Sequence, residues 1–142
     1  MRSFSMLWAV AFFSLVVGLS GGGCGSGTHS FDALGTQRDP GSDAHIQVEN
    51  IEGGNHLITL TVRNLTPPER LGTSNTVFMV WLRLPNGTTT LGSQLGYQSD
   101  SRGGRATMTT PVARFTLLVT AEANAQVTVP SDFVVLQQQV AL

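Results

Sequence analysis

The sequence predicts an all-β fold, an immunoglobulin-like β-sandwich of about seven or eight strands that follows an N-terminal signal peptide and a flexible tether. Residues 45–142 contain fourteen Thr and eleven Val, residue types that favour pleated, half-buried strands. Apolar and polar residues alternate there with a period of two, and turn residues separate the runs. Helix signals are nearly absent from the same part of the chain.

The composition limits the chain to one ordinary domain. It has 142 residues, a formal net charge of -1 and 12% charged residues, about half of the usual share of ~25%. All eight basic residues are Arg. Because electrostatic binding to nucleic acid requires a basic surface that neutralises phosphates, no nucleic-acid partner is expected.

Residues 1–23 have the profile of a signal peptide. Arg2 precedes a fourteen-residue apolar run, Met6–Leu19, and the small residues Ser20–Gly23 follow it. A membrane-spanning helix needs ~20 apolar residues. The run is therefore short for a permanent transmembrane anchor, and cleavage after export is the favoured interpretation.

The only cysteine of the chain, Cys24, follows three glycines directly. This position resembles the lipobox of bacterial lipoproteins, in which the cysteine receives a diacylglyceryl group and its amine is then acylated. Where the family has Leu three residues before the cysteine, this chain has Gly21, and the nearest Leu is Leu19. The resemblance implies attachment to a membrane through lipid on Cys24. The alternatives are an unpaired thiol in a flexible segment and a cysteine that is removed within a longer signal peptide. A lone cysteine in an exported protein has no disulfide partner, which favours lipidation.

Residues 25–44 are predicted to form a flexible tether. They are rich in Gly, Ser and Asp, include Pro40, and have Phe31 and Leu34 as their only large apolar residues. Twenty such residues would hold a domain about 25 Å from its anchor point. The predicted organisation is thus a signal peptide (1–23), a lipidated Cys24 with the tether (24–44), and a β-sandwich domain (45–142).

The first two strands are predicted to form a hairpin. Apolar residues alternate with polar ones in 46–50 and again in 58–63, and the break at 52–56 contains two glycines. A five-residue loop would place Val48 opposite Leu60 and Ile46 opposite Val62, all on one face of the sheet.

A longer connection is predicted next, because residues 64–75 contain two prolines and a glycine. Residues 76–84 are the most apolar segment of the domain and predict a strand buried on both faces, closed by a turn at Pro85–Gly87. The remaining strands are predicted at 88–95, 105–110, 113–121, 126–129 and 132–140.

Two stretches, 76–87 and 119–136, carry short motifs. The first stretch has an aromatic residue, Phe78, followed three positions later by Trp81, and then a turn at Gly87 and a strand with Leu91 and Gly92. The second has a Val-Thr-x-Glu motif, made of Val119, Thr120 and Glu122, followed by Pro130. This pattern resembles the extracytoplasmic C-terminal domain of anti-sigma-K-type factors. The resemblance implies a β-sandwich and no catalytic residues. The family's internal transmembrane helix and cytoplasmic sigma-binding domain have no counterpart here, so direct control of a sigma factor is not implied.

The titratable residues predict neither a metal site nor a cofactor site. His29 falls in the tether, while His45 and His56 belong to opposite ends of the predicted hairpin, too far apart to share an ion. In the predicted domain, neither GTSNT at 72–76 nor GSQLG at 92–96 fits the G-x-S-x-G nucleophile motif. Glu122 ends an apolar strand without a second acid nearby, so it is expected to bond a neighbouring backbone amide. The protein is accordingly predicted not to be an enzyme.

Arg102 and Arg105 are the candidate ligand-binding residues. They flank Gly103–Gly104 on a predicted hairpin loop, where two guanidiniums can hold an anionic ligand by forked hydrogen bonds. The alternative is a solvated turn, and the removal of both side chains is expected to leave the fold intact. Phe78 and Trp81 are predicted to pack in the core rather than to form an exposed binding platform.

These observations together predict a membrane-anchored lipoprotein whose non-catalytic β-sandwich is a binding, structural or sensing module at the cell envelope. It would face the periplasm or the exterior from the inner or the outer membrane, with the membrane and an envelope protein or ligand as partners. Two alternatives remain open, a soluble periplasmic or secreted factor without lipid and an envelope enzyme. Acids or histidines clustered on one face of the domain would favour the enzyme.

Overall fold

The computed structural model describes residues 27–142, so the predicted signal peptide (1–23) and Cys24 lie outside the described residues. This part of the chain is built from nine strands and two short helices, η1 (Glu52–Gly54) and α1 (Pro68–Leu71). The strands are β1 (Thr28–Leu34), β2 (Asp43–Ile51), β3 (Asn55–Arg63), β4 (Val77–Arg83), β5 (Thr89–Gln94), β6 (Gly96–Gln98), β7 (Gly103–Thr110), β8 (Arg114–Glu122) and β9 (Val134–Ala141).

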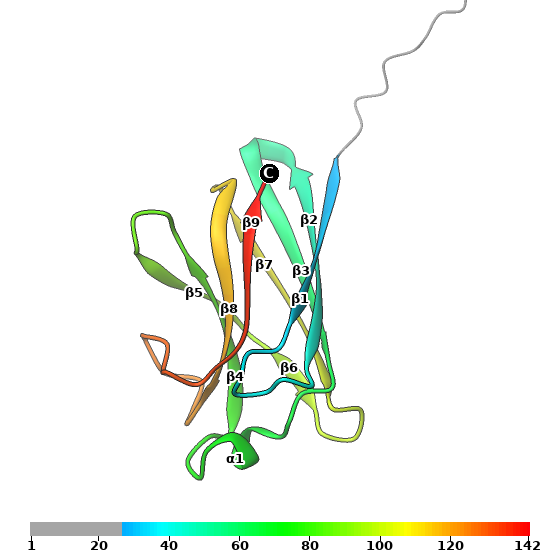
Figure 1. Cartoon of the computed structure of the whole chain (residues 1–142). Coiled ribbons are helices and arrows are strands. Elements are labelled where there is room, and N and C mark those ends of the chain that lie inside the picture. Colours follow the sequence, from blue (N-terminus) through cyan, green and yellow to red (C-terminus); the bar gives the residue numbers. More distant parts are fainter. Residues whose placement is uncertain (1–26) are drawn as a thin grey trace, which may run out of the picture.

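The strands form two antiparallel sheets that pack face to face (Figure 1). Sheet A has the order β1-β2-β3-β7-β6 and sheet B the order β5-β4-β8-β9. In chain order, β2 to β9 match strands A, B, C, C′, D, E, F and G of an immunoglobulin-like sandwich, with A-B-E-D in one sheet and C′-C-F-G in the other. The predicted fold class is confirmed, and β1 is an additional strand beside the first edge.

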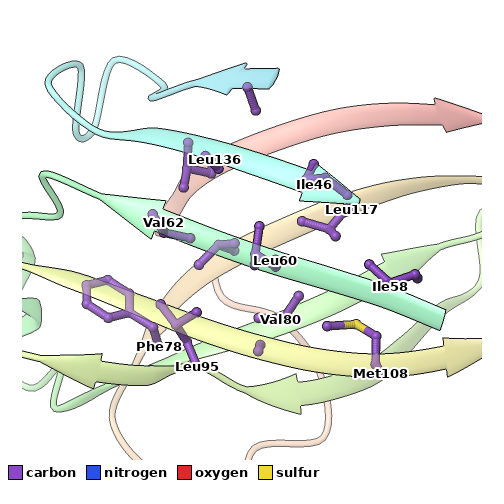
Figure 2. Close-up of a cluster of buried hydrophobic side chains, with 14 of the residues drawn as sticks. Ile46, Ile58, Leu60, Val62, Phe78, Val80, Leu95, Met108, Leu117 and Leu136 are labelled. Carbon is purple, nitrogen blue, oxygen red and sulfur yellow. The ribbon is translucent and has the colours of Figure 1, made fainter. Parts of the chain in front are cut away.

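The core lies between the sheets because inward-facing apolar residues alternate with outward-facing polar ones along most strands. Figure 2 shows side chains from both sheets, including Leu60, Val80 and Leu117, meeting in this space. Burying each such side chain contributes about 1.5–3 kcal/mol. The largest fully buried members are Phe78, Ile46, Ile58, Leu60, Leu65, Leu95, Leu117 and Leu136.

Strand β4 is buried on both faces, as its composition predicted. Phe78 and Val80 face sheet A, while Met79 and Trp81 point to the outer side of sheet B. Leu118 of β8 packs with this second pair, and the three form a small separate cluster. Both aromatic residues are fully buried, which confirms the prediction that they pack in the core.

The connection between β8 and β9 covers this outer cluster. Ala125 and Val127 of the connection pack against it, and Asn124 Oδ1 accepts a hydrogen bond of 2.9 Å from the Gln126 backbone N–H. The strand predicted at 126–129 is therefore wrong. Those residues follow a side-chain-stabilised turn and lie over the face of sheet B instead of pairing at its edge.

The β2–β3 hairpin has the predicted face but a different register. Ile46 pairs with Leu60, and Val48 pairs with Ile58. The prediction assumed a five-residue loop, whereas the three residues of η1 make the turn, with Gly53 at φ 79° and Gly54 at φ 74°. A shift of two residues keeps every side chain on its original face, so the apolar pattern alone does not distinguish the two registers.

The predicted tether is wrong for most of its length, because strand β1 lies inside it. β1 pairs with β2 from Thr28↔Glu49 to Leu34↔Asp43 and directs Phe31 and Ala33 toward the core. The folded domain therefore begins at Thr28 and not at residue 45. The alternation in β1 is short and surrounded by Gly, Ser and Asp, which is why its composition resembles that of a linker.

The turn after β1 is also ordered. The buried carboxylate of Asp39 accepts hydrogen bonds from the backbone N–H of Thr66 at 2.9 Å and from its hydroxyl at 2.8 Å. Earlier in the same turn, the Thr36 backbone N–H donates to the Val135 carbonyl at 2.9 Å, and Gly35 forms a β-bridge with Leu136. These contacts join β1 to β9 and close one side of the sandwich.

The two ends of the sandwich differ in the segments that they gather (Figure 1). We call the end where β1 begins the proximal end; it also holds the β2–β3 hairpin, the β4–β5 turn and the first residue of β8. The opposite, distal end holds the β1–β2 turn, α1 and the β6–β7 loop. The short strand β6, which the sequence did not predict, pairs with β7 near this distal end.

Candidate functional site

The structure places the two candidate ligand-binding arginines in different settings. Arg102 ends the β6–β7 loop with a positive φ of 51°, whereas Arg105 lies within β7 and points outward from sheet A. Arg102 Nε donates to the Leu65 carbonyl at 3.0 Å, and its Nη2 donates to the Asn64 carbonyl at 3.2 Å. The prediction that both guanidiniums sit on one loop is therefore wrong.

Arg102 connects the β6–β7 loop to the segment after β3. Its backbone carbonyl also accepts a hydrogen bond of 2.8 Å from the Leu65 N–H, and Asp39 holds the neighbouring Thr66. Hydrogen bonds from a charged donor are stronger than neutral ones. The side chain thus links two segments of the distal end, a contact that the predicted solvated turn does not include.

Arg105 belongs to a polar surface on the outer face of sheet A. The strand register aligns Asp32, His45, Thr61 and Arg105 in one row across β1, β2, β3 and β7. We call this row, together with the adjacent pair Asp43↔Arg63, the polar face. Two shallow grooves of about 350 and 280 Å³ lie over it.

Charges of opposite sign are separated across the polar face. The carboxylates of Asp32 and Asp43 lie on β1 and β2, while the guanidiniums of Arg63 and Arg105 lie on β3 and β7. A ligand that carries both an anionic and a cationic group can match such an arrangement, because guanidiniums bind planar oxyanions and carboxylates bind ammonium groups.

His45 and Asp32 form the only ion-pair contact among residues 27–142. The His45 Nδ1 lies 2.7 Å from Asp32 Oδ1, and the two side chains are 46% and 85% exposed. An ion pair in such an exposed place contributes only about 0–1 kcal/mol to stability. Its main effect is to orient the imidazole ring, which leaves Nε2 available to a ligand.

The other histidines lie apart from this pair. His56 Nδ1 lies 2.8 Å from Asn50 Oδ1 near the proximal end of the β2–β3 hairpin, and His29 lies on β1 rather than in a tether. No group of three or more His, Cys, Asp or Glu residues with metal-binding proximity occurs in residues 27–142.

Glu122 is buried and has a structural role. The Trp81 Nε1–H donates to Thr120 Oγ1 at 2.8 Å, and the Thr120 hydroxyl donates to Glu122 Oε1 at 2.6 Å. The same oxygen accepts a hydrogen bond of 2.8 Å from the Ser131 backbone N–H. The expected bond from Glu122 to a backbone amide is confirmed, and it fixes the connection that covers Trp81.

Sequence reasoning identified Arg105 but missed Asp32, Asp43 and Arg63. Asp32 was assigned to the tether, so its contact with His45 was not foreseen. The predicted register, with Ile46 opposite Val62, puts Arg63 opposite His45, whereas Arg63 pairs with Asp43. The alternation of Phe31 and Ala33 with Ser30 and Asp32 was the one signal that could have placed β1 beside β2.

Comparisons with known proteins add no relative. No family model matches the chain, and neither the curated proteins nor the solved structures contain a match. The resemblance of residues 76–136 to anti-sigma-K-type factors and the lipobox-like position of Cys24 therefore stay predictions. Within residues 27–142, neither helix has the length and apolarity needed to cross a membrane.

Proposed function

We propose that this chain is an exported lipoprotein whose β-sandwich is a non-catalytic binding, structural or sensing module, held at the cell envelope through lipid on Cys24. The observation that carries the proposal is the apolar run Met6–Leu19 followed by the single cysteine, four positions before the first residue of β1. A lone cysteine beside an apolar N-terminal run has no disulfide partner, and lipidation gives it a role.

The start of the fold at Thr28 changes the geometry that lipidation would impose. Four residue steps between Cys24 and Thr28 reach ~14 Å when fully extended, compared with the ~25 Å expected for a twenty-residue flexible tether. A lipidated Cys24 would hold the proximal end of the sandwich close to the bilayer. The distal end would then point away from the membrane.

The polar face is the surface that we propose for recognition. Arg105 would bind an anionic group of an envelope protein or ligand, while Arg102 would keep the adjoining loop in place. Support comes from the exposed position of Arg105, which lines one of the two grooves. Guanidiniums offer planar, paired donors to carboxylate and phosphate groups.

The anchoring part of the proposal is tested by fractionating cells that express the full chain and by mass spectrometry of the mature N-terminus. We expect membrane partitioning and an acylated peptide that begins at Cys24. Cys24→Ser should release the protein or leave an uncleaved precursor, whereas Ser26→Ala, as a nearby control, should change neither result. An unmodified mature peptide that begins after Cys24 would favour the soluble exported factor.

One observation favours an envelope enzyme as a second candidate. The Asp32–His45 contact of 2.7 Å orients an imidazole as in nucleophile-base-acid sites, and the Thr61 hydroxyl follows in the same row. The pair is exposed, so nothing in the fold excludes water from it. Hydrolysis of a p-nitrophenyl ester by the wild type, lost in both His45→Ala and Thr61→Val, would support this candidate. Equal rates in all three proteins would reject it.

A further inference from the structure

A groove with two arginines lies on the outer face of sheet B at the proximal end. Arg83 of β4 pairs with Thr116 of β8, which in turn pairs with Gln139 of β9, so these three side chains form a row. Arg114 begins β8 beside the end of β9. These four residues line a groove of about 420 Å³.

The groove is lined by two arginines and by no acidic side chain. Neither Arg83 nor Arg114 forms an ion pair within residues 27–142. The only other charged residue on the four strands of sheet B is Glu122, which is buried beneath the β8–β9 connection at the opposite end of β8. Two guanidiniums that line one groove without an acidic side chain favour an anion there.

We propose that Arg83, Arg114, Thr116 and Gln139 form a binding site for a phosphate group. Guanidiniums donate paired hydrogen bonds to phosphate oxygens, and a hydroxyl and an amide add further donors. A phosphate group suits these donors, because the oxygens of a tetrahedral oxyanion can accept hydrogen bonds from several donors at once. If the chain is lipid-anchored, as proposed above, the phosphate comes from a phospholipid headgroup.

The position of the groove supports a lipid source. Arg83 pairs next to the β4–β5 turn and Arg114 begins β8, so both lie at the end from which β1 enters the sandwich. The ~14 Å reach from Cys24 would bring this end to the headgroup layer. Glu49 and Glu52 occupy the same end on sheet A. The anionic surface of the membrane would therefore attract the arginines of sheet B and repel the glutamates beside sheet A. The sandwich would tilt so that the groove faces the lipid.

Inorganic phosphate tests the site itself. Thermal unfolding of the full chain in a maltoside detergent is followed as phosphate replaces chloride at constant ionic strength. A ligand that binds only the folded state raises the unfolding midpoint, so we expect a rise in the wild type and at least a tenfold weaker response in Arg83→Gln/Arg114→Gln. Arg38→Gln/Arg70→Gln, which removes two exposed guanidiniums outside this groove and outside the polar face, should respond like the wild type.

Vesicles test the source of the phosphate. Phenylglyoxal modification of each arginine is measured by mass spectrometry for the chain in phosphatidylglycerol vesicles and in maltoside micelles, which contain no phosphate. We expect Arg83 and Arg114 to be protected in the vesicles, while the exposed Arg70 of α1 reacts equally in both. Protection by inorganic phosphate without protection in vesicles would overturn the lipid source, and an absence of both effects would overturn the site.

The failure of the proposed function gives a different result. If Cys24 is not lipidated but phosphate still stabilises the wild type and not the double variant, the anchoring proposal fails while the phosphate site stands. If Cys24 is lipidated and neither probe acts on Arg83 and Arg114, the anchoring stands and the phosphate site fails.

Discussion

At the scale of single residues, Arg102 and Arg105 show how position decides the role of a side chain. Arg102 donates hydrogen bonds to the carbonyls of Leu65 and Asn64, while Arg105 on β7 projects from the outer face of sheet A. The two residues are three positions apart and of the same type. They therefore form a matched pair for measuring how much the hydrogen bonds of Arg102 to the backbone stabilise the fold.

We expect Arg102→Ala to lower the free energy of unfolding by about 1–2 kcal/mol, because each lost hydrogen bond contributes about 0.5–1.5 kcal/mol. Arg105→Ala should change it by no more than about 0.5 kcal/mol, as for an ordinary surface position. Urea unfolding of both variants measures the difference. Equal stabilities would show that the contacts of Arg102 contribute nothing to the fold.

Trp81, Thr120 and Glu122 form a buried polar chain in which one hydroxyl serves two partners. Thr120→Val removes that hydroxyl while nearly preserving the volume, so the indole N–H is left without its acceptor and Glu122 loses a donor. Leaving buried polar groups unpaired should cost about 2–4 kcal/mol.

The conservative variant Thr120→Ser separates this loss from simple packing. It keeps both hydrogen bonds and removes one methyl group, at a cost of about 1 kcal/mol. Guanidinium unfolding of the two variants provides the comparison. A Val variant as stable as the Ser variant would mean that the polar chain adds no net stability.

At the scale of elements, the β2–β3 hairpin depends on glycine at its turn. Gly54 has a φ of 74° with open space where a Cβ would project, so the effect of a side chain there is conformational rather than steric. Gly41 also has open space but no positive φ. We expect Gly54→Ala to destabilise the protein by about 1 kcal/mol, and Gly41→Ala to stabilise it by about 0.4–1 kcal/mol. Thermal unfolding of both variants tests this contrast, which would be refuted if the two shifts had the same sign.

Alternation predicted the strands that have one buried face, and β4 was predicted from its continuous apolar run. The same reasoning failed for residues 126–129, because Val127 packs from a loop against the outer cluster around Trp81 and not from a strand into the core. Strands β1 and β6 were not predicted, because they are rich in small and polar residues. Their pairing depends on neighbours that lie far away in the sequence or across a turn, which local composition does not encode.

The candidate sites were less accessible to sequence reasoning than the fold. The sequence selects Arg105 for its nearness to Arg102, but its neighbour in the row is Thr61 on β3, followed by His45 on β2 and Asp32 on β1. A row across a sheet is set by register, and a register shift of two residues leaves the apolar pattern unchanged. The same holds for the groove around Arg83, because its four polar residues come from three strands, β4, β8 and β9.

At the scale of the whole molecule, the sandwich is closed on one side and open on the other. The bridge from Gly35 to Leu136 joins β1 to β9, whereas β5 is an edge strand with β4 as its single partner. A groove of about 490 Å³ lies between β5 and β7, and Leu91 is half exposed beside it. β1 thus does more than extend sheet A, because it also closes the space between the two sheets.

This role of β1 gives a test of the domain boundary. A chain that starts at residue 27 retains β1, while one that starts at residue 45 corresponds to the domain expected from composition. The shorter chain loses the core contacts of Phe31 and Ala33, the Asp39 carboxylate that holds Thr66, and the bonds from Thr36 to β9. The lost apolar burial alone should cost about 3 kcal/mol or more, and the newly exposed edge of β2 should promote aggregation.

Urea unfolding followed by the fluorescence of Trp81, the single tryptophan in both chains, measures the difference. We expect a cooperative transition with a blue-shifted folded state for the longer chain, and a much lower midpoint or insoluble protein for the shorter one. Equal midpoints would return residues 28–44 to the status of a dispensable tether.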